Sequence, residues 1–212
     1  PGTYTVTVSI QDAFGNAGTD DFLLTVPQVA TRVENDLESD EYNPGDVLSF
    51  DVDVLDQSNE KMTADVSVTI IDPNGAELYK GIVNSGQHVE LEFGSYSAPG
   101  TYTITSQYTA KNLEDTDRVT LNAVVALDSG LEGESLTLKN TGNVPYTERV
   151  DFILVATDED GEKHYYIVPQ DVTLEPGKEQ TYDLSYEVPD GEYTLIVDDA
   201  PTDLSQLEEE QV

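Results

Sequence analysis

Carboxylates dominate the groups in this sequence that could perform chemistry. Asp and Glu number 43 against 9 Lys and Arg, with two His and no Cys. In the stretch "DEDGE" (158–162), Asp158, Asp160 and Glu162 surround a tight turn. Calcium prefers several oxygens from a flexible loop, so these three side chains are the candidate metal site. The full D-x-D-x-D-G…E calcium loop is absent, and a solvated acidic hairpin tip is the alternative.

The two histidines, His88 and His164, each stand inside a predicted strand. A metal pair or a catalytic base is one interpretation, and a half-exposed strand histidine is the other. We favour the second, because no nucleophile elbow and no H-E-x-x-H motif accompanies them. Pairs of carboxylates could act as in glycosidases, but among 43 acidic residues the composition singles out none. We therefore expect no catalytic residues, no enzymatic activity and no required cofactor, with calcium as the ion that the chain would take.

The charge balance excludes several classes of partner. The formal net charge of the 212 residues is −34, so the phosphates of nucleic acid would be repelled. Binding to an anionic membrane through a basic patch is excluded for the same reason. A surface with this charge repels itself, and salt screens that repulsion. A salt-rich habitat or a calcium-bearing cell surface would suit such a protein; plain solubility is the alternative.

A repeated segment indicates how the chain is organised. "PGTYTVTV" (1–8) returns as "APGTYTITSQY" (98–108) and, more loosely, as "VPDGEYTLIV" (188–197). Its tyrosines, Tyr4, Tyr102 and Tyr193, are 98 and 91 residues apart, which matches an immunoglobulin-like sandwich of about 100 residues. Each copy predicts a late strand of a sandwich, with the Tyr as a tyrosine corner. A ligand platform made by these tyrosines is the alternative.

Alternating apolar and polar residues predict an all-β fold of tandem immunoglobulin-like β-sandwich domains. Residues 1–27 predict the C-terminal hairpin of a truncated domain, whose front part we expect to lie outside this chain, as in a piece of a longer multidomain protein. We expect two sandwiches, at residues 28–126 and 127–200. We expect an acidic tail at 201–212, which could start a helix, since Ser205 and Glu208 fit a capping box. The strands are expected at 3–11, 21–26, 29–34, 47–55, 64–72, 77–83, 88–93, 101–109, 117–125, 134–140, 147–157, 163–168, 180–188 and 192–198.

Two segments resemble known families. Residues 38–109 resemble the MG2-like domain of macroglobulin-type proteins, through "YNPGD", "DVDV", "IIDPNG" and "PGTYT". Residues 136–197 resemble the CARDB and NPCBM-associated sandwiches, through "NTGN" and "LEPGK". The resemblance implies that both segments are parts of a large extracellular protein, notably of the archaeal S-layer-like or adhesin-like kind. The thioester of protease-trapping macroglobulins needs a Cys, which this chain lacks.

These observations predict a non-enzymatic, extracellular structural segment of a multidomain cell-surface or S-layer-like array. Its partners would be other copies or other domains of the same surface protein, with a membrane anchor outside this segment. The alternative is a carbohydrate- or protein-binding accessory module of a secreted enzyme or adhesin. A carbohydrate binder would need an exposed aromatic row, for which Tyr165, Tyr166, Tyr182 and Tyr186 are the candidates. A cross-link between Lys139 and an Asn or Asp, with Asn140 adjacent, is a further option; a solvated lysine is the alternative.

Overall fold

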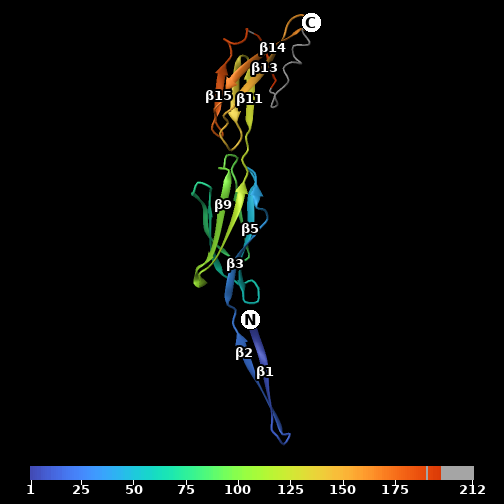
Figure 1. Ribbon diagram of the computed structural model, residues 1–212, viewed down its shortest axis with the longest axis vertical. Helices are drawn as coiled ribbons and strands as arrows, with labels where there is room; N and C mark the ends of the chain where they lie inside the picture. The colour runs from blue at the N-terminus through green and yellow to red at the C-terminus, as the bar shows by residue number, and fades with distance from the viewer. Residues whose placement is uncertain (190, 197–212) are drawn as a thin grey trace. The chain divides into compact units, whose positions relative to one another are not determined.

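The computed structural model describes residues 1–189 and 191–196, which form β-strands and one 3-10 turn, η1 (Thr109–Lys111) (Figure 1). The chain divides into two compact units. Unit 1 comprises Pro1–Tyr42, Asp46–Phe93 and Gly100–Leu121; unit 2 comprises Asn43–Gly45, Gly94–Pro99 and the chain from Asn122 onward. In the described residues, no helix has the length and apolarity needed to cross a membrane. The predicted tail at 201–212 and the end of the third predicted domain, at 197–200, lie outside the described residues.

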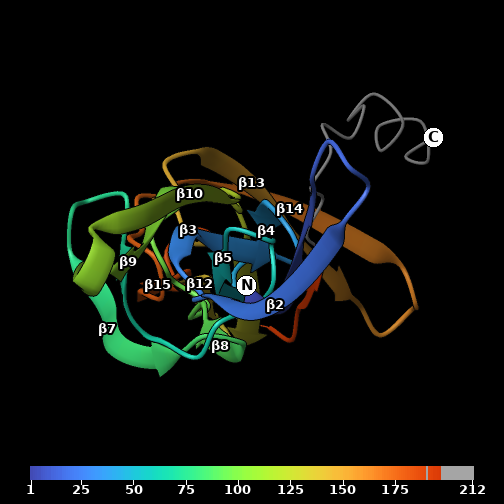
Figure 2. The same cartoon turned by 90° about the horizontal axis from the view of Figure 1, so that it is seen from below.

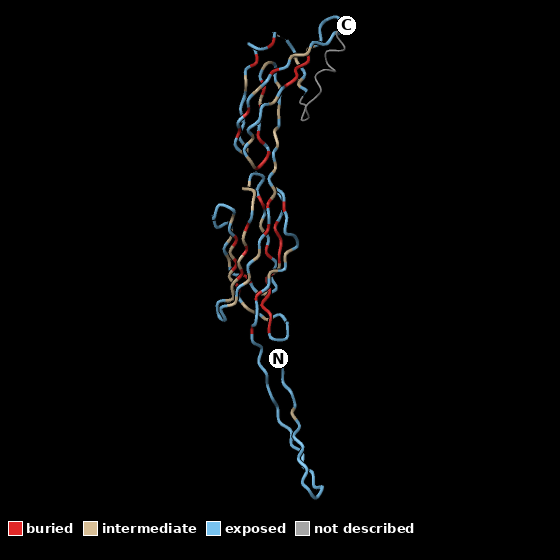
Figure 3. Tube along the Cα trace, viewed as in Figure 1, coloured by how far each residue is buried: buried red, intermediate tan, exposed pale blue. Residues whose placement is uncertain are grey.

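Unit 1 begins with a two-stranded hairpin of β1 (Gly2–Gln11) and β2 (Ala17–Val26), paired antiparallel over their full length. Because side chains alternate across a strand, one face carries Tyr4 opposite Leu24 and Val6 opposite Phe22. Neither strand has a fully buried side chain, and the hairpin is pale blue over almost its whole length in Figure 3.

The rest of unit 1 is a sandwich of two sheets, of orders β4-β10-β9-β6-β7 and β3-β5-β8. Viewed nearly along the strands, β7, β9 and β10 follow an arc outside β3 and β5 (Figure 2). All strand pairs are antiparallel except β4 with β10, which is parallel. The strands are β3 (Ala30–Leu37), β4 (Glu41–Tyr42), β5 (Val47–Asp56), β6 (Asp65–Ile71), β7 (Glu77–Asn84), β8 (Gln87–Glu92), β9 (Gly100–Tyr108) and β10 (Leu113–Leu121).

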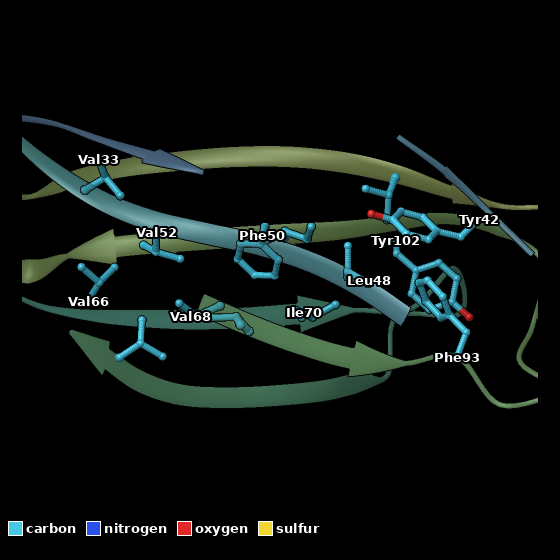
Figure 4. Close-up of a cluster of buried hydrophobic side chains, with 14 of the residues drawn as sticks. Val33, Tyr42, Leu48, Phe50, Val52, Val66, Val68, Ile70, Phe93 and Tyr102 are labelled. Atoms are coloured by element: carbon cyan, nitrogen blue, oxygen red, sulfur yellow. The ribbon is translucent and has the colours of Figure 1, made fainter. Parts of the chain in front are cut away.

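The core of this sandwich follows from alternation in its central strands. In β5, Leu48, Phe50 and Val52 face inward and are fully buried (Figure 4). Burying such a side chain stabilises the fold by about 1.5–3 kcal/mol. At one end of the core, the ring of Phe93 lies 5.5 Å from Tyr42 and 4.9 Å from Tyr102, with interplanar angles of 57° and 65°. Tilted contacts of this kind are the favoured aromatic arrangement.

Unit 2 contains a second sandwich, built from the sheets β11-β12-β15 and β14-β13-β16. Its core includes Leu136 and Leu138 from the first sheet and Phe152 and Leu154 from the second, all fully buried. The strands are β11 (Leu127–Glu132), β12 (Ser135–Asn140), β13 (Arg149–Thr157), β14 (Lys163–Asp171), β15 (Glu179–Asp183) and β16 (Thr194–Ile196).

The predicted fold class, tandem immunoglobulin-like β-sandwiches, is confirmed. Several predicted strands have the wrong ends; β2 and β10, for example, each begin four residues earlier than expected, at Ala17 and Leu113. The strand expected at 117–125 ends at Leu121, because the side chain of Asn143 binds the backbone of Asn122 and Val124. The strand expected at 180–188 ends at Asp183, since the N–H groups of Glu187 and Val188 donate back to the carbonyl of Leu184.

Two strands were not predicted. β4 has only two residues, and β11 ("LDSGLE") carries Gly130 in its interior, which weakens a strand pattern. The domain boundaries at 27/28 and 126/127 stay a prediction.

Candidate functional site

The acidic tip of the β13–β14 hairpin is organised around one carboxylate. Oδ1 of Asp158 accepts the N–H groups of Asp160 at 3.0 Å and Glu162 at 2.8 Å. The backbone N–H of Asp158 donates to the carbonyl of Glu162 at 3.0 Å, and its carbonyl accepts the N–H of Gly161 at 3.1 Å. Asp158 therefore closes its own turn.

The second oxygen of this carboxylate is also engaged. Nε2 of His164 lies 3.1 Å from Oδ2 of Asp158. The hydrogen bond with His164, followed by the N–H of Glu162, holds the pKa of the Asp158 carboxyl below its usual value. Hydrogen bonds to the charged form have this effect, so Asp158 is ionised at neutral pH.

The other two predicted ligands, Asp160 and Glu162, are exposed at the same tip. Within residues 1–189 and 191–196, no group of three or more His, Cys, Asp or Glu side chains is arranged to hold a metal ion. The structure thus brings the three residues into one turn and gives Asp158 a structural role there, while calcium binding stays a prediction.

The same turn recurs at three other places in the described residues, in the β1–β2 and β6–β7 hairpins and after β5, and these turns were not connected from the sequence. Asp12, Asp56 and Asp72 each accept, through Oδ1, the N–H groups of the residues two and four positions ahead, at 2.7–3.0 Å. The residue three positions after each of the four aspartates has a φ of 60–88°, which favours Gly or Asn. These residues are Gly15, Asn59, Gly75 and Gly161. An Asp followed three residues later by Gly or Asn is the signal that would have found them.

Asp56 is the fully buried member of this set. Its Oδ2 accepts a hydrogen bond from Nε2 of Gln28 at 3.2 Å. Burial alone would raise the pKa of the Asp56 carboxyl, but the N–H groups of Glu60 and Ser58 and the Gln28 amide outweigh it and hold the pKa below its usual value. The carboxylate is thereby tied to the backbone.

His88 sits between two carboxylates on the outer face of the sheet β3-β5-β8. Its Nδ1 lies 2.8 Å from Oδ1 of Asp51, and its Nε2 lies 3.6 Å from Oε1 of Glu90. The hydrogen bond with Asp51 is the main cause of a raised pKa of the His88 imidazole. His88 and His164 belong to different units, and each is half exposed with carboxylate neighbours of its own sheet or turn, as a strand histidine would be.

The same sheet face contains a close ion pair. Nζ of Lys61 lies 2.7 Å from Oδ2 of Asp53, whose side chain is mostly buried. The hydrogen bond and charge of Asp53, with Asp51 and Asp36 further away, raise the pKa of the Lys61 ammonium. This lysine offsets part of the negative charge that β3 and β5 place on the face.

Two asparagines of the "NTGN" stretch are the most enclosed amides in the described chain. Nδ2 of Asn140 donates to the carbonyls of Val144 and Leu174, both at 2.8 Å, and its Oδ1 accepts the N–H of Gly142 at 2.9 Å. Both N–H donors and the oxygen of this amide hold backbone, which is how buried polar groups avoid a desolvation cost.

Asn143 holds a second set of backbone groups, all within unit 2. Its Nδ2 donates to the carbonyls of Ser97 and Asn122 at 3.1 and 3.0 Å, and its Oδ1 accepts the N–H of Val124 at 2.7 Å. The two asparagines therefore act as braces of the unit 2 loops.

Lys139, considered above for a cross-link, lies beside Asn140 in β12. Lys139 is exposed, whereas Asn140 is fully buried. Neighbouring residues of a strand point to opposite faces, and the Asn140 amide is already committed to backbone. The structure gives Lys139 the position of a solvated lysine.

The repeated tyrosines include two corners of the predicted kind. The hydroxyl of Tyr4 donates to the carbonyl of Pro1 at 3.3 Å, and that of Tyr193 donates to the carbonyl of Pro189. Tyr102 is buried in the core of unit 1. Tyr4 and Tyr102 are each the third residue of their strands, β1 and β9, whereas Tyr193 directly precedes β16. The equivalence of Tyr4 and Tyr102 supports a structural role for the repeat.

The candidate aromatic row is not assembled on one exposed face. Tyr166 and Tyr182 pack against the unit 2 core, and the ring of Tyr166 meets Tyr193 edge-on at 5.7 Å. Tyr165 points to the opposite face of β14 from its neighbour. Tyr186 is 94% exposed in a turn.

Comparisons with known proteins add little to this picture. No family model matches the chain, and no curated protein matches it. Among solved structures, the chain is similar to trypsin-activated alpha-2-macroglobulin from Escherichia coli, with 13% identity and a TM-score of 0.40, covering 80% of this chain and 15% of that one. It is also similar to Escherichia coli alpha-2-macroglobulin activated by porcine elastase, with 13% identity and a TM-score of 0.38, covering 72% of this chain and 17% of that one.

Proposed function

We propose that this chain is a non-enzymatic structural segment of a multidomain extracellular protein, located at the cell surface. In this proposal the sandwiches provide rigid length, and their acidic faces hold water and cations. The partners are other copies or other domains of the same surface protein, in an S-layer-like or adhesin-like assembly anchored outside this segment.

One observation carries the proposal: three of the buried polar side chains in residues 1–189 and 191–196, those of Asp56, Asn140 and Asn143, hold backbone. The carboxylate of Asp56 closes a turn, and the amides of Asn140 and Asn143 brace loops. Enzymes instead direct perturbed, partly enclosed groups at a place where substrate can react. The carboxylates at the acidic tip and around His88 lie on exposed surface, which suits solvation and charge.

The sequence resemblances are consistent with this role. An MG2-like sandwich at 38–109 and a CARDB-like sandwich at 136–197 are modules that we propose for the two units. Both are non-catalytic frames in this interpretation, and fold alone does not give them an activity.

Surface labelling of intact source cells tests the proposal. Antibodies raised against the purified chain should label unbroken cells, and a cation chelator should release part of the labelled protein. Label that is seen only after cell lysis would contradict an extracellular location. Uniform label that neither chelator nor salt affects would contradict the role given to cations.

A second candidate, a protein-binding accessory module, rests on the outer face of the sheet β14-β13-β16. Ile153 and Val155 are buried but lie outside the core cluster, and their cross-strand neighbours on this face include Tyr165, Ile167 and Ile196. Ile167 and Ile196 are half exposed, so an aliphatic patch with one tyrosine faces outward. Such a patch suits a protein surface better than a sugar, which stacks on aromatic rings.

Glycan and protein binding can be separated by substitution. If the module binds sugar, a glycan array should show saturable binding that is lost in Tyr165→Ala, Tyr182→Ala or Tyr186→Ala. If it binds protein, Ile167→Asp should remove the interaction with a protein partner. Absence of both interactions leaves the structural role as the better account.

A further inference from the structure

The hairpin β1–β2 exposes an apolar face, whereas the hairpin β9–β10, which begins with the same "PGTYT" sequence, buries the corresponding face. In β1–β2, Tyr4 pairs with Leu24 and Gly2 with Val26. In β9–β10, Tyr102 pairs with Val119 and Gly100 with Leu121. The two hairpins thus share the "PGTYT" entry and the cross-strand register counted from it.

The backbone at the entry is also the same. Gly2 and Gly100 have φ values of 142° and 126°, a conformation that side chains other than glycine rarely adopt. Tyr4 makes the corner hydrogen bond to Pro1, as expected for a strand at the end of a sandwich. The hairpin therefore has the local geometry of a finished sandwich element.

The two hairpins differ in how far the side chains of this face are exposed to solvent. Tyr102 and Val119 are each 1% exposed, whereas Tyr4 and Leu24 are 50% and 47% exposed. Val6, Val8, Ile10, Phe22 and Val26 continue the same face along the hairpin. A contiguous apolar face of this kind marks an interaction surface, and a lone hairpin is marginal in water.

We infer that the apolar face of β1–β2 packs against a β-sheet contributed by residues that precede Pro1 in the same polypeptide, completing a further immunoglobulin-like sandwich. The copy in unit 1 shows what that sheet is. β9–β10 is covered by β3-β5-β8 and flanked by β4 and β6, and all of these strands come before β9 in the chain. The occupant is thus an apolar three-stranded sheet encoded upstream of the hairpin.

A second copy of the chain is a poorer occupant. Two identical hairpins packed face to face would bring their Asp20 carboxylates together, because Asp20 lies on the apolar face opposite Val8. A sheet from another part of the same polypeptide would cover the apolar face without placing two Asp20 carboxylates against each other.

Hydrogen exchange in the native polypeptide that contains these residues tests the inference. The amide protons of β1 and β2 should exchange about tenfold or more slowly than in the 212-residue chain. Leu24→Asp should remove this protection, because Leu24 lies on the apolar face. Leu23→Asp is the matched control, because Leu23 lies on the opposite face and should leave the protection unchanged.

Three results would overturn it. The native polypeptide could supply no residues before Pro1, or its β1 and β2 amides could exchange as fast as those of the 212-residue chain. The 212-residue chain could also form a dimer with a protected hairpin that Leu24→Asp, but not Leu23→Asp, dissociates. That last outcome would make a second copy the occupant.

Discussion

Nδ2 of Asn143 donates a hydrogen bond to the carbonyl oxygen of Asn122 at 3.0 Å, across 21 residues of sequence. The same amide holds Ser97 and Val124, so one side chain fixes two other backbone segments of unit 2, at residue 97 and at residues 122–124. Replacing it would leave those groups enclosed and without this partner.

Asn143→Ala is expected to lower the free energy of unfolding of unit 2 by about 1–3 kcal/mol, because buried polar groups lose their hydrogen bonds. Urea denaturation followed by circular dichroism measures the change. Asn84→Ala, at an exposed position of β7, is the control and should change stability by less than about 0.5 kcal/mol. Equal effects of the two substitutions would contradict the bracing role.

Gly142→Ala is expected to destabilise unit 2 by about 1–3 kcal/mol, since the added methyl forces the backbone to move. A Cβ at Gly142 would lie 2.2 Å from the carbonyl oxygen of Val124 and 2.8 Å from the nitrogen of Ala126. Gly130→Ala is the control, because a Cβ there meets no atom within 4 Å. Thermal unfolding of both variants measures the difference. If the Gly142→Ala protein is as stable as the Gly130→Ala protein, the 140–143 loop can move to accept the methyl group without loss of stability.

Asp158→Ala should lower the melting temperature of unit 2 at neutral pH, whereas Asp160→Ala should not, because only Asp158 closes the turn. The pKa of Asp158 lies below its usual 3.8 in the folded chain. Its contribution to stability is therefore present above pH 3.8 and is lost as the pH falls through the lowered pKa. The difference between Asp158→Ala and the wild-type chain should accordingly disappear in strong acid.

The same variants test the calcium prediction. Isothermal titration with calcium should show heat that Asp160→Ala and Glu162→Ala reduce, if the tip binds the ion through these side chains. Titration curves that are unchanged in both variants would leave the tip as a turn alone.

His88 should contribute to stability in the opposite pH direction. Its pKa is raised above 6.5 by Asp51, so the contribution is fully present below pH 6.5 and is lost as the pH rises through the raised pKa. The stability difference between wild type and His88→Gln should be larger at about pH 5.5 than at about pH 8.5. Asp51→Asn should move the NMR titration midpoint of His88 down toward the usual histidine value; an unmoved midpoint would rule out Asp51 as the cause.

The melting temperature should rise with NaCl into the molar range. The net charge is −34, and the Debye length falls from about 10 Å at 0.1 M salt to about 3 Å at 1 M. NaCl and KCl should act equally if screening is the cause, and millimolar calcium should add a further increase. A flat response in differential scanning calorimetry would contradict a stabilising role for cations.

Much of the fold could be predicted because alternation is a local property. In β5, apolar residues at every second position predict both the strand and its buried face, and Leu48, Phe50 and Val52 are indeed buried. The "PGTYT" repeat predicted the tandem organisation because the same entry turn recurs at the start of β1 and β9.

The parts that were missed depend on contacts distant in sequence. Nothing near residue 122 indicates that Asn143 will capture its carbonyl and end β10. The two residues of β4 are a strand only because Thr120 and Leu121 lie beside them. The role of Asp158 depends on local sequence instead: its spacing to Gly161 is shared with the turns at Asp12, Asp56 and Asp72, but the neighbouring acidic residues also fit a set of calcium ligands.

The parallel pairing of β4 with β10 has a mechanical consequence. Glu41 and Tyr42 lie beside Thr120 and Leu121, and the N–H of Thr120 donates to the carbonyl of Asp40 at 2.8 Å. Because β4 and β10 run in the same direction, a force that pulls the chain before β4 away from the chain after β10 acts along both strands. The bonds between them are then loaded in shear and share the force, whereas an antiparallel pair at this position would be peeled open one bond at a time.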